Sequence, residues 1–346
     1  MSLRQAFEQQ AESCARLGSP FMAQLCRLLA DHWPQEGALS RRAAQFQGDL
    51  GPAGASLPLR IAGGLHALVL SRSCAALADV FPPRKVPDAC LLPAVLEAMR
   101  MHDAFLTDWI ESPPQTNEVR RSAALMAGAH VAHARFPLPV TLSELGASGG
   151  LNLMWDRYAL KIGTARFGAR SPVLTLAPDW SGPLPPRNAP VIADRAGVDL
   201  NPLDPAQPED LLRLTAYLWA DQPDRLALTR AAGKAMDAPL VRADAIDWLE
   251  ARIAERHEGR LHLIQHTVAW QYFPQDRQDR GRAIIEAAGS QATQDCPLAW
   301  LSMESDGDRS GSQGAALVLR LWPGNVTLPL GRADFHGRWI SWAGAS

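Results

Sequence analysis

The chain has 346 residues, of which 47% are hydrophobic and 20% are charged, which is typical of a globular protein and excludes a disordered chain. Its 34 basic and 36 acidic residues give a net charge of -2, so we expect no large basic field for binding nucleic acid. No apolar run approaches the ~18 residues that cross a bilayer, and no apolar signal core begins the chain, which predicts a cytoplasmic protein without a membrane segment.

Helical patterns fill residues 1–136. Phe7, Ala11 and Cys14 recur at intervals of three and four residues, which places them on one face of a helix. The sequence Gly-Ser-Pro at residues 18–20 ends this helix and begins another, because glycine favours helix ends, serine caps a helix, and proline suits a first turn. We therefore expect a helical N-terminal region.

Two more helices are expected before residue 136. Apolar residues repeat at helical spacing over residues 88–111, and a double proline at 113–114 stops that pattern. Thr116 is then expected to cap a helix that runs to about Arg135.

The pattern changes after residue 136, where short apolar runs alternate with helical or turn-rich segments. Runs of four to eight residues that mostly follow helices predict a parallel sheet with crossover helices. These runs are residues 140–145, 189–198, 239–243, 261–267 and 298–303. The last runs, residues 315–322, 326–330 and 338–342, are joined by short connections, which predicts antiparallel strands that close the sheet. Residues 163–190 hold many Gly and Pro and predict an insertion or extended flap, and residues 310–314 predict a turn.

The predicted fold is therefore α/β, with a helical region over 1–136 and a mostly parallel sheet domain over 137–346.

The chemistry is expected in the segment TLSELGASGGLNL, residues 141–153. A strand ends at Leu145, a turn of small residues follows, and a helix is expected near Gly150. Such a turn lets a ligand approach backbone N–H groups, and Glu144 adds an acid where α/β folds bind ligands. The alternative is a tight connection that binds nothing.

The residues of this turn discriminate between two nucleotide ligands. A dinucleotide-binding loop would need glycine at the close-packed positions where Ser148 and Leu151 stand, which argues against NAD. Residues 144–150 follow the pattern acid-x-Gly-x-small-x-Gly. This pattern resembles the first motif of class I S-adenosylmethionine-dependent methyltransferases, with Ser148 in place of the middle glycine. The resemblance implies a Rossmann-like sheet and S-adenosylmethionine as cofactor. It implies contacts to that cofactor from Glu144, Gly146, Ala147, Ser148, Gly150 and Asn152.

Later segments follow in the order that this resemblance requires. Asp199 ends the second run and matches the acid that accepts from both ribose hydroxyls. It stands 53 residues after Gly146, against ~20 in the related dinucleotide fold, so the insertion must account for the difference. Otherwise Asp199 is a turn residue. Asp244 and Ala245 match the positions that meet adenine, although Asp244 is equally suited to cap a helix.

Polar residues near the expected cleft are candidates for the acceptor side. Gln265 is expected beside the cofactor, and His266 is suited to take a proton from a substrate nucleophile, with a structural hydrogen-bonded histidine as the alternative. Gln115, Asn117, Glu118 and Arg195 are expected at the edge of the pocket. For the residues at 115–118 the alternative is helix capping alone, and for Arg195 it is an ion pair with Asp194.

Over residues 7–342 the sequence also resembles a bacterial family of uncharacterised proteins. The resemblance is carried mainly by residues 17–20, 115–118, 144–152, 155–158 and 195–199. It implies a methyltransferase-like sheet with a helical N-terminal region and no established substrate.

The function expected from the sequence is methyl transfer from S-adenosylmethionine to an unknown acceptor. A non-catalytic nucleoside-binding or regulatory module is the alternative, and an NAD(P)-dependent oxidoreductase is less favoured. No metal site is expected, because the five cysteines form no C-x-x-C pair and His130 and His133 lack a third ligand.

Overall fold

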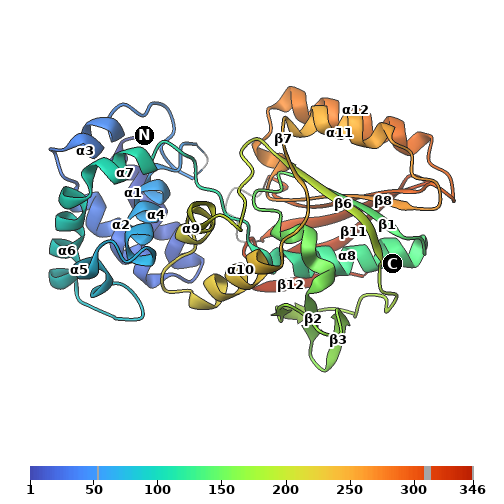
Figure 1. Cartoon of the computed structure of the whole chain (residues 1–346), viewed down its shortest axis with the longest axis horizontal. Helices are drawn as coiled ribbons and strands as arrows, with labels where there is room; N and C mark the ends of the chain where they lie inside the picture. Colours follow the sequence, from blue (N-terminus) through green and yellow to red (C-terminus); the bar gives the residue numbers. More distant parts are fainter. Residues whose placement is uncertain (53, 308–312, 345–346) are drawn as a thin grey trace. The chain divides into compact units, whose positions relative to one another are not determined.

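The computed structural model describes residues 1–52, 54–307 and 313–344 (Figure 1). The chain forms two compact units, Met1–Thr116 with Gln207–Ala227 and Asn117–Ala206 with Leu228–Ser346. The division thus lies at residues 116 and 117 rather than at the predicted 136 and 137, and a later segment returns to the first unit. The turn predicted at 310–314 lies largely outside the described residues.

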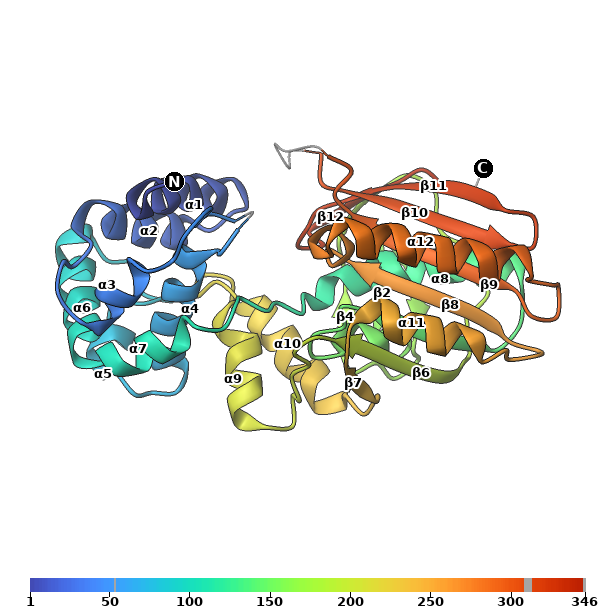
Figure 2. The same ribbon diagram turned by 90° about the horizontal axis from the view of Figure 1, so that it is seen from above.

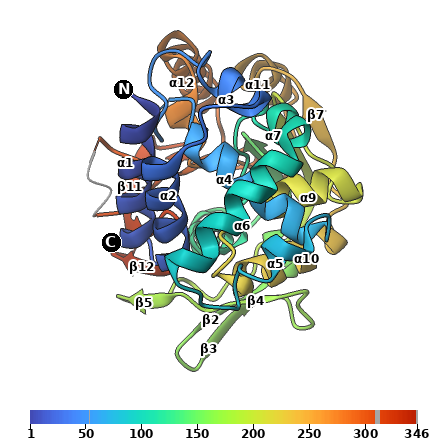
Figure 3. The same ribbon diagram turned by 90° about the vertical axis from the view of Figure 1, so that its left-hand side faces the viewer.

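The first unit is helical (Figure 3). Its helices are α1 (Leu3–Arg16), α2 (Pro20–His32), α3 (Ala38–Ala43), α4 (Leu57–Leu70), α5 (Ala75–Ala78), α6 (Asp88–Met101), α7 (Asp103–Trp109) and α9 (Pro208–Ala216). Ser19 caps α2 as predicted, and its Oγ accepts from the N–H of Met22 at 3.2 Å. The unit's boundary with the second unit falls inside α10 (Pro223–Ala235).

The single helix predicted over 88–111 is two helices. α6 ends where His102 leaves helical geometry, with φ -114° and ψ 28°. The carboxylate of Asp103 then accepts from the backbone N–H groups of Ala38 and Leu39, at 2.7 and 2.8 Å. The break between α6 and α7 is therefore accompanied by a contact with α3, which is distant in sequence. Local periodicity does not reveal such a contact.

The second unit is built on a nine-stranded sheet of order β5-β12-β11-β10-β9-β8-β1-β6-β7. Its main strands are β1 (Val140–Leu145), β6 (Ile192–Asp199), β7 (Leu240–Arg242), β8 (Leu261–Thr267), β9 (Leu298–Glu304), β10 (Ala315–Trp322), β11 (Val326–Ala333) and β12 (Trp339–Trp342). Helices α11 (Ala245–Ala254) and α12 (Gln275–Ser290) cover one face, and α8 (Ser122–Arg135) covers the other (Figure 2).

The predicted mixture of strand directions is confirmed. β7, β6, β1, β8 and β9 are parallel, whereas β9, β10, β11 and β12 form antiparallel pairs. The chain order of the parallel strands reverses between β1 and β8, which is the arrangement of doubly wound sheets. Ligands of such sheets bind outside the carboxyl ends of the strands at this point.

The predicted insertion contains short strands. β2 (Ala159–Ile162), β3 (Ala165–Gly168) and β4 (Thr175–Leu176) form a separate sheet of order β3-β2-β4. β5 (Asp179–Ser181) pairs with β12 at the edge of the main sheet. The long connection between β1 and β6 is therefore largely ordered, which accounts for the distance in sequence between Gly146 and Asp199.

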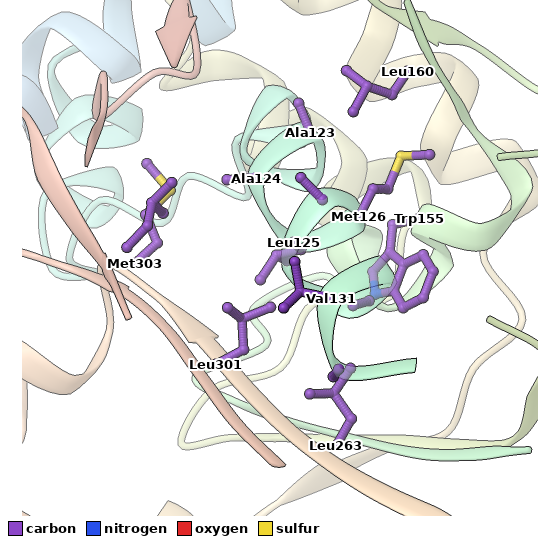
Figure 4. Packing of buried hydrophobic residues seen from close by; sticks show 14 of the residues in the cluster. Ala123, Ala124, Leu125, Met126, Val131, Trp155, Leu160, Leu263, Leu301 and Met303 are labelled. Carbon is purple, nitrogen blue, oxygen red and sulfur yellow. The ribbon is translucent and has the colours of Figure 1, made fainter. Parts of the chain in front are cut away.

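Helix α8 lies in the core of the second unit rather than in the helical unit. Its residues Leu125 and Val131 pack toward Leu263 and Leu301 of the sheet (Figure 4). A Cβ at Gly128 of this helix would stand 2.6 Å from Leu301 Cδ1, so only glycine permits the observed approach. This packing explains why the boundary between the units precedes α8.

Candidate functional site

The carboxyl ends of β1, β6, β8 and β9 bring most of the predicted residues to one edge of the sheet. Glu144 is in register with Gly197 of β6 and with Gln265 of β8. Adjacent strand residues point to opposite faces, so Glu144 and Gln265 lie on the α8 face and His266 lies on the face of α11 and α12. The predicted site is thus divided into two clusters.

The cluster on the α8 face is a connected hydrogen-bond network. Gln265 Oε1 accepts from Trp155 Nε1 at 3.1 Å, and its Nε2 donates to the carbonyl of Asn152 at 3.2 Å. Asn152 Oδ1 in turn accepts from Ser122 Oγ at 2.7 Å. Buried side chains from α8, β8 and the segment after β1 therefore fix one another's orientation around Glu144.

Glu144 is the most perturbed carboxyl group in this cluster. Only 1% of the residue is exposed, and its Oε2 has no hydrogen-bond partner among the described residues. Burial raises the pKa of Glu144 to about 8, and a hydrogen bond with Gln265 works in the opposite direction. Glu144 is therefore mostly protonated at neutral pH. A buried carboxyl of this kind at a strand end is typical of functional sites.

The loop after β1 is held against Asp199. The N–H of Ser148 donates to Asp199 Oδ2 at 2.9 Å, and the N–H of Asn201 donates to Oδ1 at 2.8 Å. Ser148 has a φ of +53°, the left-handed region in which the related motif carries glycine, and its buried Oγ has no partner among the described residues. Asp199 therefore lies beside the loop. Its bond from Asn201, two residues on, also fits the turn residue that was the alternative, and its predicted role toward a ribose stays a prediction.

Gly146 is required by packing as well as by conformation. Its φ is +68°, and a Cβ there would stand 2.5 Å from the Cβ of Ala269. The loop after β8 thus fills the space next to Gly146, and a larger residue would disturb that contact. Replacing Gly146 therefore tests the packing of two loops rather than ligand binding alone.

The end of the loop joins a short helix. Gly150, with φ +68°, precedes the seven-residue 3-10 helix η2 (Leu151–Arg157), which begins where a helix was predicted. The N–H of Leu151 donates to Asn117 Oδ1 at 2.7 Å, and the N–H of Ala147 donates to the carbonyl of Val198 at 2.9 Å. Asn117 thus supports the loop from outside it.

His266 has both ring nitrogens engaged. Trp300 Nε1 donates to His266 Nε2 at 2.9 Å, and because indole is only a donor, the proton of the neutral ring is on Nδ1. Nδ1 then donates to Glu304 Oε1 at 2.7 Å, and the ring stacks on Trp270 with centroids 5.0 Å apart. Proton transfer to Nε2 would require the Trp300 bond to break. The predicted role as a general base stays a prediction.

Glu304 is a site residue that the sequence reasoning missed. Its Oε1 also accepts from the backbone N–H groups of Ala269 and Trp270, at 3.0 and 3.1 Å. Val268 at the start of this loop has φ +51°, a conformation that β-branched residues rarely adopt. An acid directly after the run 298–303 was the available signal, since it too lies at a strand's carboxyl end.

Three other predicted residues have structural roles here. Asp244 caps α11, accepting from the N–H groups of Ile246 and Asp247 at 2.9 and 3.1 Å, with Ala245 as the first helical residue. Arg195 forms a two-bond ion pair with Asp156, at 2.6 and 2.8 Å. The cap matches the structural alternative considered for Asp244. The alternative for Arg195 was an ion pair with Asp194, which is wrong in its partner, because Asp194 bonds Arg252 instead.

The segment before α8 differs from the prediction. A 3-10 turn, η1 (Val119–Arg121), precedes α8, and its cap is Glu118, which accepts from the N–H of Arg120 at 3.1 Å. Thr116 therefore does not begin this helix. Gln115 and Thr116 belong to the first unit, whereas Asn117 and Glu118 belong to the second.

Two cavities of the second unit lie away from the loop after β1. One of about 340 Å³ lies between α12 and the turn that joins β10 to β11, and one of about 330 Å³ lies at the amino ends of β8 and β9. Within the described ranges, no group of three or more His, Cys, Asp or Glu side chains is arranged to hold a metal ion. No helix in those ranges is both long and apolar enough to span a membrane.

Comparison with known proteins identifies a bacterial family. The model of a family described as "Uncharacterized protein conserved in bacteria" (DUF2332) matches residues 4–342. No curated protein and no solved structure matches the chain.

Proposed function

We propose that this chain, which belongs to the bacterial DUF2332 family, binds S-adenosylmethionine at the carboxyl ends of β1 and β6 and transfers its methyl group to an acceptor. One observation carries the proposal: Asp199, at the carboxyl end of β6, lies 2.9 Å from the backbone nitrogen of Ser148 in the loop after β1, and β1 borders the point where the strand order reverses. An acid at the end of the second parallel strand is the group expected to accept from ribose hydroxyls.

The buried polar atoms of the loop are compatible with a bound nucleoside. Glu144 Oε2 and Ser148 Oγ have no partner among the described residues. Leaving a buried polar atom unpaired costs about 1–3 kcal/mol, so atoms of this kind fit a site that a ligand completes. Gly146 gives no such support, because Ala269 fills the space beside it. The proposal therefore depends on Asp199 and the loop around Ser148.

The chain's own residues would bind the cofactor, orient it toward the acceptor, and exclude water from the site. S-adenosylmethionine, when bound, supplies a methyl group that is already activated for transfer. Asp199 would hold the ribose, and the loop of residues 146–150 would border the cofactor. Glu304 holds the neighbouring loop by accepting from the N–H groups of Ala269 and Trp270, and His266 bonds the same carboxylate oxygen. Correct placement of two reactants lowers a barrier by up to roughly 7–11 kcal/mol, so a dedicated base is not essential.

Calorimetric titration tests the cofactor assignment. S-adenosylmethionine and S-adenosylhomocysteine should bind, whereas NAD and NADP should not. Asp199→Asn should weaken binding at least ~10-fold, or about 1.4 kcal/mol. Asp204→Asn is the matched control, because this exposed carboxylate also accepts a backbone N–H in the same segment but lies beyond the loop contact. A folded wild-type protein that binds neither methyl donor nor product at millimolar concentration contradicts the proposal.

A non-catalytic nucleoside-binding module is the second candidate, and the state of His266 favours it. Both ring nitrogens of His266 are bonded, to Trp300 and to Glu304, so this histidine is not poised to accept a proton. Transfer of labelled methyl groups across a panel of small-molecule acceptors separates the two functions. Tight binding of S-adenosylmethionine with no transfer to any acceptor favours the module.

A further inference from the structure

We propose that the cavity between α11 and α12 binds a small carboxylic acid with an apolar body. The cavity has a volume of about 330 Å³, at the lower end of the ~300–1,000 Å³ of ligand sites. It is formed by the end of α11, the turn at residues 255–257, one side of α12, and residues 296–298 before β9. These segments all belong to the second unit.

This cavity is distinct from the proposed nucleoside site. His262 and Leu298, which line it, stand at the amino ends of β8 and β9, whereas Thr267 and Glu304 stand at the carboxyl ends. The five residue steps from His262 to Thr267 span roughly 17 Å at about 3.3 Å per residue. A ligand here therefore does not compete with one at the loop after β1.

The walls of the cavity suit an apolar ligand body. Ile253 of α11 and Ile284 of α12 are only half-buried, and Leu298, the first residue of β9, is buried. The remaining wall is mostly alanine, whose small side chain leaves the volume open. These alanines are Ala254, Ala287, Ala288 and Ala292. Covering such apolar surface removes it from water, which favours binding.

Two polar groups fit a ligand carboxylate. His257 Nε2 is buried and has no hydrogen-bond partner among the described residues. The neighbouring Arg256 donates only to the carbonyl of Gln291, at 3.4 Å, and forms no ion pair with a carboxylate in the described part of the chain. One ligand oxygen would accept from Arg256 and the other from His257, a charge-assisted arrangement that a neutral ligand lacks.

The acidic residues of the cavity are already paired with other arginines. Glu250 bonds Arg280 at 2.5 Å, and Glu255 lies 3.9 Å from Arg252. Arg256 therefore remains as the cation that faces a ligand. A metal ion is not the expected occupant, because the described residues offer no cluster of three or more suitable ligands.

The test compares acids with their uncharged amides. Octanoate and phenylacetate are titrated into the full-length protein beside octanamide and phenylacetamide, by calorimetry or by ligand-observed NMR. The acids should bind at least ~10-fold more tightly than the amides, and Arg256→Gln should remove this preference. Ala288→Phe should abolish binding of all four by filling the cavity. Arg282→Gln, at an exposed residue of α12 that does not line the cavity, should change nothing.

Three results would overturn the inference. The first is the absence of binding of either acid to a folded wild-type protein. The second is equal affinity for acid and amide, and the third is unchanged binding in Ala288→Phe. The far-ultraviolet circular dichroism of each variant shows that it is folded. Arg256→Gln alters an exposed side chain, so it tests the charge requirement even if the phenylalanine variant does not fold.

Discussion

Replacing Glu144 by glutamine should alter how stability depends on pH. The pKa of Glu144 is about 8 in the folded chain, against an ordinary value of 4.5. The folded state therefore holds a proton that the unfolded state releases above pH 4.5. It follows that Glu144 lowers stability progressively as the pH rises from 4.5 toward 8.

The magnitude is set by the size of this shift. Each pH unit between the two pKa values changes the free energy of unfolding by about 1.4 kcal/mol. The range from pH 6.5 to 8 lies above the pKa values of His130, His133 and His262, which burial lowers below the ordinary 6.5. Allowing for partial titration near pH 8, wild type should lose roughly 1.5 kcal/mol across this range through Glu144.

Urea denaturation followed by circular dichroism measures this effect. The free energy of unfolding is determined for wild type and Glu144→Gln at several pH values from 6.5 to 8, and the difference between them cancels the other titrating groups. From pH 6.5 to 8, the free energy of unfolding of the variant should rise by roughly 1.5 kcal/mol relative to that of wild type. Glu258→Gln, at an exposed carboxylate, is the control and should show a constant difference. A difference for Glu144→Gln that is constant to within ~0.3 kcal/mol would refute the reasoning.

Three further predictions concern single side chains. Ser148→Gly should raise the free energy of unfolding by about 1 kcal/mol, because it relieves a left-handed backbone and removes an unpaired buried Oγ, and a less stable variant in urea denaturation would contradict this. Asp244→Ala should cost ~0.5–2 kcal/mol in the same assay through loss of the α11 cap, whereas Asp244→Asn should cost little, and equal losses would exclude capping as the cause. His262 is buried with its pKa lowered to about 3, so wild type should lose stability as the pH falls below 6.5, and His262→Gln should reduce that loss by about 1.4 kcal/mol per pH unit. Parallel pH profiles of wild type and His262→Gln would contradict the last prediction.

Apolar run length and connection length determined much of the sheet from the sequence alone. The runs at 140–145 and 261–267 are β1 and β8 with the predicted bounds, because strands buried on both faces read as continuous apolar segments. Long connections predicted parallel neighbours, and the short ones after residue 315 predicted antiparallel strands. Ser19 was also predictable as a cap, since capping depends on residues adjacent in sequence.

The tertiary structure decided which polar residues share a face. Alternation along a strand already separates Gln265 from His266, but only the register of β1 against β8 places Glu144 beside Gln265. The carboxylate of Asp103 accepts from the first residues of α3, at the point where the predicted long helix breaks. Glu304 likewise accepts from the N–H groups of a loop that lies more than 30 residues earlier in the sequence. Contacts between residues distant in sequence depend on how helices and strands pack together, and local patterns carry no record of that packing.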